Sequence, residues 1–248
     1  MKVPQHSHSP LRAASRNNWT RLFITMSPAH HFTLYTTKGL APNGWKVMIV
    51  LEELGLDYQP LYLDLSKNEQ KGEEHTKHNP NGRIPTLIDH KNGDLTVWES
   101  GAILAYLVEK YDSTHKISFE KPEDKIHQLQ WLFFQASGQG PYFGQAGWFR
   151  FLASEKIPSA IERYQNETLR VLGVLEKVLS ARPYLVGDKA SVADLSFITW
   201  NDVASSRVVK DFNGFDFEKD FPSVYRWHND LTGRPAVKKV LALWYATL

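Results

Sequence analysis

The sequence predicts a two-domain protein in which an α/β domain is followed by an all-α domain. Over residues 32–112, short apolar and β-branched runs alternate with segments whose apolar residues recur at helical spacing. From residue 122 onward only helical patterns occur, and a polar linker over residues 113–121 separates the two regions. The length of 248 residues exceeds that of one average domain and agrees with this division.

The first region, residues 32–112, contains the elements of a mixed sheet. A helix with an apolar stripe ends at Gly55, which suits the C′ position. Two strands joined through Asn92 and Gly93 form a hairpin. The other predicted elements are a strand over 32–36, a strand over 58–63, one short helix within 66–78, and a helix with Leu104, Leu107, Val108 and Tyr111 at helical spacing. The order β-α-β-α-β-β-α is that of a thioredoxin-like domain.

Helix starts in the second region, residues 122–248, are marked by proline and by capping residues. Pro122 with Glu123 and Asp124 opens the first helix, because proline fits the first turn and carboxylates favour its positive end. A long amphipathic helix is predicted over residues 159–181. Further starts are predicted at the capping-box pattern Ser191-Val192-Ala193-Asp194, at Pro222 and at Pro235.

Residues 1–31 differ from the rest of the chain, because they contain basic residues and no carboxylate. We interpret them as a disordered N-terminal extension. An acid-poor leader with arginine and serine is also typical of a mitochondrial transit peptide, and a natural start at Met26 is a third interpretation. The histidines of this segment lack the spacing of metal ligands, so no metal site is predicted.

Composition excludes several classes of function. The net charge of +2 gives no indication of a nucleic-acid partner or an anionic membrane, and no apolar run is long enough to span a membrane. The chain has no cysteine, which rules out disulfides and a cysteine nucleophile of its own. Any thiol chemistry must therefore use a thiol that arrives with a ligand.

Two short motifs at the ends of the predicted hairpin form a candidate ligand site. Ile84-Pro85 enters the first strand, where proline leaves the preceding backbone free to contact a ligand. Glu99-Ser100 heads the next helix, and a carboxylate and a hydroxyl beside free helix N–H groups suit a small zwitterion. An acidic first turn and a serine cap are also common structural features. Arg83 either pairs with a ligand carboxylate or lies in solvent.

Asn43 follows Pro42 at the start of the first helix and has two interpretations. It is an N-cap that satisfies a backbone N–H, or its amide donates to a thiolate placed at the positive end of the helix. Tyr35, near the end of the first strand, either aims its phenol at the same thiol or packs as a core ring. Thr36 and Thr37 are weaker candidates for the same role.

The segment over residues 142–151 is rich in aromatic residues and glycine. Core packing is the default explanation for such a segment. Ligand pockets, however, are apolar clefts that favour domain interfaces, so the segment is also a candidate for lining a hydrophobic substrate pocket. The candidate lining residues are Tyr142, Phe143, Trp148 and Phe149.

Six motifs in both regions carry a family resemblance. They lie at residues 41–47, 79–85, 98–104, 131–135, 185–189 and 234–237. With these motifs, the chain from Phe32 to Leu248 resembles the fungal branch of glutathione transferases related to the yeast nitrogen-regulator prion protein. Bacterial Nu-class transferases share much of the first runs.

The resemblance implies the glutathione transferase fold, a homodimer and a glutathione site. Ile84 would offer main-chain hydrogen bonds, and Pro85 would follow a cis peptide bond. Glu99 and Ser100 would take the γ-glutamyl end of glutathione, and Asn43 would face the sulfur. The chain departs from some relatives because Gln70 replaces a histidine near the glycyl end and Leu40 replaces a catalytic serine. It also lacks an Asn/Gln-rich prion segment before residue 32.

We therefore predict a cytoplasmic, homodimeric glutathione transferase of the detoxification type, with glutathione as substrate and no metal. Bound glutathione would attack a disulfide sulfur or, more weakly, an electrophilic carbon, because the chain has no thiol of its own. Two alternatives stay open. One is a non-catalytic regulator that binds a protein partner, and the other is a carrier of hydrophobic ligands.

Overall fold

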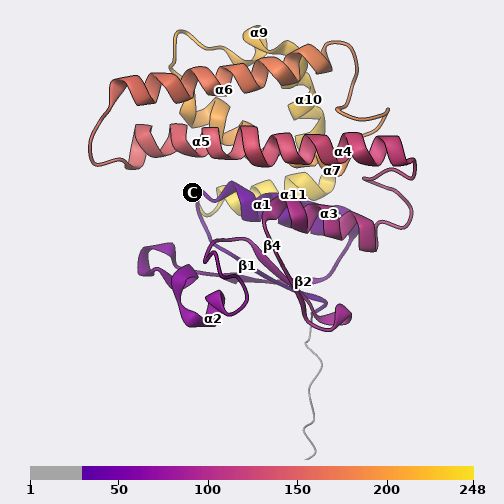
Figure 1. Cartoon of the computed structure of the whole chain (residues 1–248). Helices are drawn as coiled ribbons and strands as arrows, with labels where there is room; N and C mark the ends of the chain where they lie inside the picture. Colours follow the sequence, from indigo (N-terminus) through magenta and orange to yellow (C-terminus); the bar gives the residue numbers. More distant parts are fainter. Residues whose placement is uncertain (1–29) are drawn as a thin grey trace, which may run out of the picture.

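The structure, a computed structural model, describes residues 30–248 (Figure 1). Its sheet has the strand order β2-β1-β3-β4, in which β1 pairs parallel with β2 and antiparallel with β3, and β3 pairs antiparallel with β4. The strands are β1 (Phe32–Thr36), β2 (Tyr58–Tyr62), β3 (Thr86–Asp89) and β4 (Leu95–Trp98). The predicted order of strands and helices, and the thioredoxin-like class, are confirmed.

Two long helices cover one face of this sheet, and a short helix lies on the other (Figure 1). The long ones are α1 (Pro42–Leu54) and α3 (Ser100–Tyr111), and the short one is α2 (Glu73–Thr76). The prediction of one short helix within residues 66–78 is confirmed by α2, and left-handed Asn68 and extended Gly72 separate the turns that precede it. Before α2 the chain forms the 3₁₀ turns η1 (Leu65–Lys67) and η2 (Glu69–Lys71), and a third turn, η3 (His90–Asn92), closes the hairpin.

The rest of the described chain is helical. Its elements are α4 (Pro122–Phe134), η4 (Gln135–Gln139), α5 (Gly140–Gly147), η5 (Trp148–Leu152), α6 (Pro158–Leu179), α7 (Val192–Leu195), α8 (Ile198–Val203), η6 (Ala204–Val208), α9 (Phe217–Asp220), α10 (Pro222–Thr232) and α11 (Pro235–Tyr245). η4, η5 and η6 are π-helical, and η4 and η5 continue α4 and α5 without a break. The helix starts predicted at the three prolines and at the capping box are confirmed, and α6 ends at Leu179, two residues before its predicted end.

A glycine brings α1 unusually close to β1. A Cβ built on Gly44 would lie 2.0 Å from Thr36 Oγ1, a separation that real side chains do not adopt. The absence of a side chain at Gly44 therefore lets the first turn of α1 rest on the end of β1. This contact fixes Asn43, the preceding residue, at that edge of the sheet.

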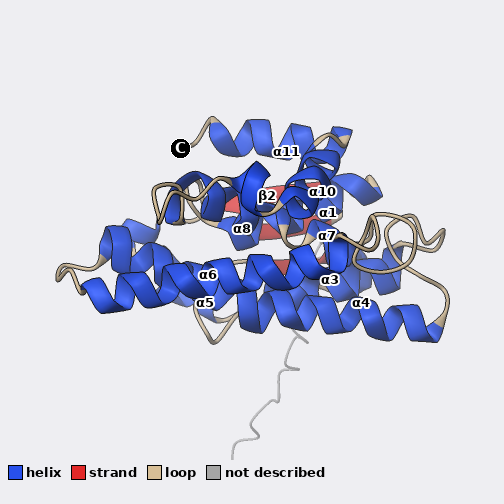
Figure 2. Cartoon of the chain, turned by 90° about the horizontal axis from the view of Figure 1, so that it is seen from above, coloured by secondary structure: helices blue, strands red, loops and turns tan. Residues whose placement is uncertain are grey.

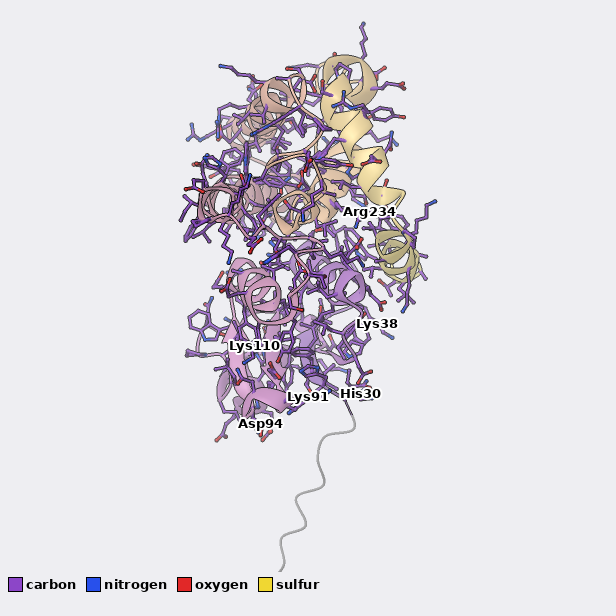
Figure 3. All side chains as sticks on the ribbon, turned by 90° about the vertical axis from the view of Figure 1, so that its right-hand side faces the viewer. His30, Lys38, Lys91, Asp94, Lys110 and Arg234 are labelled. Atoms are coloured by element: carbon purple, nitrogen blue, oxygen red, sulfur yellow. The ribbon has the colours of Figure 1, made fainter. Side chains whose placement is uncertain are left out.

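The helical part packs against α1 and α3 on the side away from the sheet (Figures 1 and 2). Trp45 of α1 stacks on Trp244 of α11, with ring centroids 6.1 Å apart. Arg234, at the start of α11, lies at the boundary between the two parts (Figure 3) and forms an ion pair with Glu53 of α1. Both contacts tie the end of the chain to the first helix.

The predicted N-terminal extension falls mostly on residues 1–29, which lie outside the described residues. Its last two residues, His30 and His31, belong to the described part. His30 contacts Asp57 at 3.0 Å, and the largely buried His31 contacts Asp89 at 3.3 Å. These two residues therefore lead directly into β1.

Candidate functional site

The predicted ligand residues lie at one edge of the sheet because of strand register. Thr86 of β3 pairs with Tyr35 of β1 on one side and with Trp98 of β4 on the other. Pro85, just before Thr86, therefore lies at the edge where β1 ends and Glu99 begins the next segment. α1 and α3 both start from this edge and pack against each other.

A buried asparagine holds the loop before β3. Asn79 is 2% exposed, and its Nδ2 donates to Arg83 O at 2.8 Å and to Thr86 Oγ1 at 2.9 Å. The peptide bond between Ile84 and Pro85 is cis, as the resemblance implied. Ile84 is half-buried, and Arg83 is exposed. The sequence motif contained Asn79, but its role in shaping the loop appears only in the structure.

Glu99 and Ser100 form the N-terminus of α3. Glu99 has φ 68° and ψ 114°, a left-handed conformation that is costly for a residue with a Cβ. No side chain caps this helix within residues 30–248, so the structural alternative for these two residues is not realised. Glu99 is exposed, whereas Ser100 is 8% exposed. A carboxylate and a hydroxyl thus adjoin the positive end of α3.

Asn43 is the second residue of α1, and its side chain does not cap the helix, because Ala41 is the N-cap residue. Instead, Asn43 Oδ1 accepts a hydrogen bond of 3.0 Å from Nε1 of Trp200 in α8. Among residues 30–248, none accepts from Asn43 Nδ2. The amide N–H groups are therefore available to a ligand at the positive end of α1.

A buried lysine lies one turn after Asn43. Lys46 is 1% exposed, and its Nζ donates to Gln135 Oε1 at 2.5 Å. Burial lowers the pKa of Lys46 to about 7, and the negative charge of Glu99 opposes this shift. Hydrogen bonds continue from Gln135 to Gln139 at 3.1 Å and from Gln139 to Asn201 at 2.7 Å. This buried chain runs behind the site, from near Glu99 to the neighbour of Trp200.

Several other sequence candidates lie elsewhere. Tyr35 packs against His75 and His78, with ring centroids 5.3 and 5.7 Å apart, so its ring faces α2 rather than α1. Thr37 Oγ1 donates to Leu63 O at 2.6 Å. The structure therefore supports the packing interpretation of Tyr35. The hydroxyl of Thr37 joins the segment after β1 to the segment after β2.

The four aromatic candidates do not form one exposed surface. Phe143 is fully buried, whereas Trp148 is 47% exposed. Tyr142 and Phe149 are half-buried and both contact Tyr164 of α6, at centroid distances of 6.4 and 5.4 Å. α5 reaches Trp200 through Gly144, because a Cβ built there would lie 3.5 Å from the indole ring.

The described part of the chain has neither a metal-ligand cluster nor a membrane-spanning helix. No cluster of three or more histidine, cysteine or acidic side chains suitable for a metal ion occurs among residues 30–248. No helix within the same residues is long and apolar enough to cross a membrane.

Comparisons with known proteins identify both parts of the chain. The family model of the glutathione S-transferase N-terminal domain matches residues 31–109, and that of the C-terminal domain matches residues 138–235. Glutathione S-transferase 2 of Schizosaccharomyces pombe is 51% identical over 84% of this chain and 94% of its own length. Protein URE2 of Candida albicans is 37% identical over 96% of this chain and 78% of its own length.

A solved structure agrees with these matches. The glutathione transferase URE2P6 of Phanerochaete chrysosporium, crystallised in complex with oxidized glutathione, superposes with a TM-score of 0.86. It is 56% identical, and the comparison covers 90% of this chain and 100% of that one. The similarity therefore extends over both the sheet and the helices.

Proposed function

This chain belongs to the glutathione S-transferase family, in its URE2-like fungal branch, and we propose that it activates the thiol of bound glutathione for exchange with disulfides. Conjugation of electrophilic carbons is the proposed weaker activity. The single observation that carries this proposal is the meeting of Pro85, Glu99 and the start of α1 at one edge of the sheet.

We assign the ligand contacts from the position of each group at this edge. Glu99 and Ser100 receive the ammonium and carboxylate of the γ-glutamyl end, because an acidic side chain adjoins the positive end of α3 there. The backbone of Ile84 is assigned to the main chain of glutathione, and exposed Arg83 to a ligand carboxylate. Asn43 donates to the sulfur from its amide.

The proposed chemistry uses two glutathione molecules. The first, as thiolate, attacks one sulfur of a disulfide, so that a mixed disulfide forms and the other sulfur leaves as a thiolate that takes up a proton. A second glutathione attacks the mixed disulfide, which gives oxidized glutathione and the second free thiol. The chain contributes no sulfur nucleophile, because it has no cysteine. The Phanerochaete relative was crystallised with oxidized glutathione, the product of this sequence.

A homodimer completes the proposal. On α4, Ile126, Leu129 and Phe133 are 62%, 40% and 66% exposed. They follow the spacing i, i+3 and i+7 and so share one face of the helix. An exposed apolar face of this kind is typical of an interface. We assign it to a second copy of the chain.

The proposed function is tested by steady-state reduction of a small mixed disulfide by glutathione. Wild type should turn over, and Asn43→Ala should lose about 10- to 1000-fold in kcat/KM if the amide stabilises the thiolate. Asn166→Ala, on the exposed surface of α6, is the matched control and should retain wild-type rates. A wild-type protein that is inert at saturating glutathione would rule out the disulfide-exchange activity.

A further inference from the structure

The hydrogen bond between Trp200 and Asn43 fixes the orientation of the Asn43 amide. Trp200 Nε1 lies 3.0 Å from Asn43 Oδ1. An indole N–H only donates, whereas an asparagine side chain carries an acceptor oxygen on one side and two donor hydrogens on the other. The oxygen must therefore face Trp200. Both N–H groups of Asn43 consequently point to the other side of the amide.

The residues on either side of Trp200 anchor it. Thr199 Oγ1 donates to Pro42 O at 3.0 Å, so two consecutive residues of α8 bind two consecutive residues of α1. Asn201 Oδ1 accepts from the fully buried Gln139 at 2.7 Å. α8 is thus attached both to the start of α1 and to the helical segment that contains η4.

The indole of Trp200 is also held on its other side. A Cβ built on Gly140 would lie 3.6 Å from Trp200 Nε1, and one built on Gly144 would lie 3.5 Å from Cη2. The ring therefore rests at van der Waals distance from two glycine positions of α5. A half-buried ring confined in this way has little freedom to change its rotamer.

We infer that Trp200 is a positioning residue, which holds the Asn43 amide with its N–H groups toward the sulfur of bound glutathione. The inference rests on the proposed function. Without the indole N–H, the amide is free to rotate and to present its oxygen, which repels a thiolate. Trp200 itself touches neither glutathione nor the reacting sulfur in this assignment. It acts through Asn43 alone.

The experiment measures the thiol pKa of bound glutathione, from the ultraviolet absorbance of the thiolate as a function of pH, and requires no second substrate. Wild type should lower this pKa below the value of about 8.5 for a free thiol. Trp200→Phe keeps an aromatic ring and removes the N–H. It should raise the pKa of the bound thiol by up to about one pH unit and lower kcat/KM by about 3- to 10-fold.

A double-mutant cycle separates positioning from general damage to the fold. If Trp200 acts through Asn43, then Trp200→Phe should change neither the thiol pKa nor kcat/KM in an Asn43→Ala background. Trp227→Phe is the matched control, because it removes another indole N–H that bonds to a buried oxygen, that of Asp194, away from the site. This control should lower stability and leave the thiol pKa unchanged.

The outcomes are distinguishable. If Asn43→Ala raises the thiol pKa and Trp200→Phe matches wild type, the inference about Trp200 is wrong and the proposed function stands. If Trp200→Phe has the same effect with and without Asn43, the inference is also wrong. If wild type binds no glutathione, or leaves its thiol pKa unshifted, the proposed function is wrong and the inference is lost with it.

Discussion

Arg234 binds Glu53 through two hydrogen bonds, from Nε to Oε1 at 2.6 Å and from Nη2 to Oε2 at 2.8 Å. Glu53 is 4% exposed and belongs to α1, whereas Arg234 immediately precedes α11. The pair therefore joins the helix that carries Asn43 to the last helix of the chain. A two-point geometry of this kind is the stronger form of an arginine–carboxylate contact.

Arg234→Met should lower the free energy of unfolding by about 2–3 kcal/mol, because within residues 30–248 it leaves the buried carboxylate of Glu53 with Lys116 as its only ion-pair partner. Lys239→Met is the control. Lys239 pairs with Glu52 between the same two helices but is 61% exposed, and its loss should cost less than about 1 kcal/mol. Urea unfolding at one fixed protein concentration measures both values. Equal losses of unfolding free energy in the two variants would contradict the greater contribution of the buried Arg234–Glu53 pair.

Glu53 should also make stability depend on pH. Burial alone would raise its pKa, but hydrogen bonds and charge from Arg234, with a contribution from Lys116, outweigh burial and hold the pKa below its ordinary value of 4.5. A carboxyl group whose pKa is lowered by folding stabilises the fold above its unfolded pKa and loses this effect as the pH falls through its folded pKa. The stability difference between wild type and Glu53→Gln should therefore be full near neutral pH and shrink below pH 4.5. A difference that stays constant through the acid range would disprove this.

Asp194 should be among the residues most important for folding of the helical part. Its buried carboxylate accepts from Leu185 N, from Trp227 Nε1, and from both N and Oγ of Ser191. Asp194→Ala should cost about 2–4 kcal/mol, because it leaves buried donors without partners. Asp216→Ala removes a cap from α9 at the exposed surface and should cost about 1 kcal/mol. Thermal unfolding of the two variants tests whether Asp194→Ala loses more stability than Asp216→Ala.

The backbone conformation of Glu99 should lower the stability of the fold, whereas its side chain should contribute to glutathione binding. Its φ of 68° is strained for alanine and unstrained for glycine. Glu99→Gly and Glu99→Ala should therefore both lose most of the affinity for glutathione, whereas Glu99→Gly should be the more stable of the two by about 1 kcal/mol. Calorimetric titration and urea unfolding give the two quantities. If alanine is as stable as glycine here, the strain is relieved by the surrounding loop.

Phe133→Asp should convert the proposed dimer into monomers, because it places a charge on the exposed apolar face of α4, at its most exposed residue. Leu243→Asp is the control, since Leu243 is 47% exposed on α11, on the opposite side of the molecule from α4 (Figure 2). Sedimentation equilibrium measures the mass of each variant. A wild-type protein that is monomeric at micromolar concentration would overturn the dimer itself.

Local patterns in the sequence predicted most of the fold. Pro122 and the capping box at Ser191 act within one helical turn, so their effect is readable from neighbouring residues. The ligand motifs were predictable in the same way, because the hairpin brings Pro85 and Glu99 to one edge.

The site residues that the sequence did not predict depend on contacts between residues far apart in the chain. Trp200 lies 157 positions after Asn43, and Lys46 reads as a surface lysine, although it is buried with its Nζ bound to Gln135 of η4. The π-helical turn at residues 135–139 also reads as ordinary helix, although it places Gln135 and Gln139 in the buried chain. No local periodicity encodes such pairings.

The attachment of α8 to the start of α1 divides control of the site between two stretches of chain. The groups assigned to glutathione lie between residues 43 and 100, whereas the donor that orients Asn43 comes from residue 200. Changes in α8 can therefore tune the acidity of the bound thiol while every glutathione contact stays the same. Substitutions in α8 therefore offer a way to change reactivity during evolution while the residues assigned to glutathione stay the same.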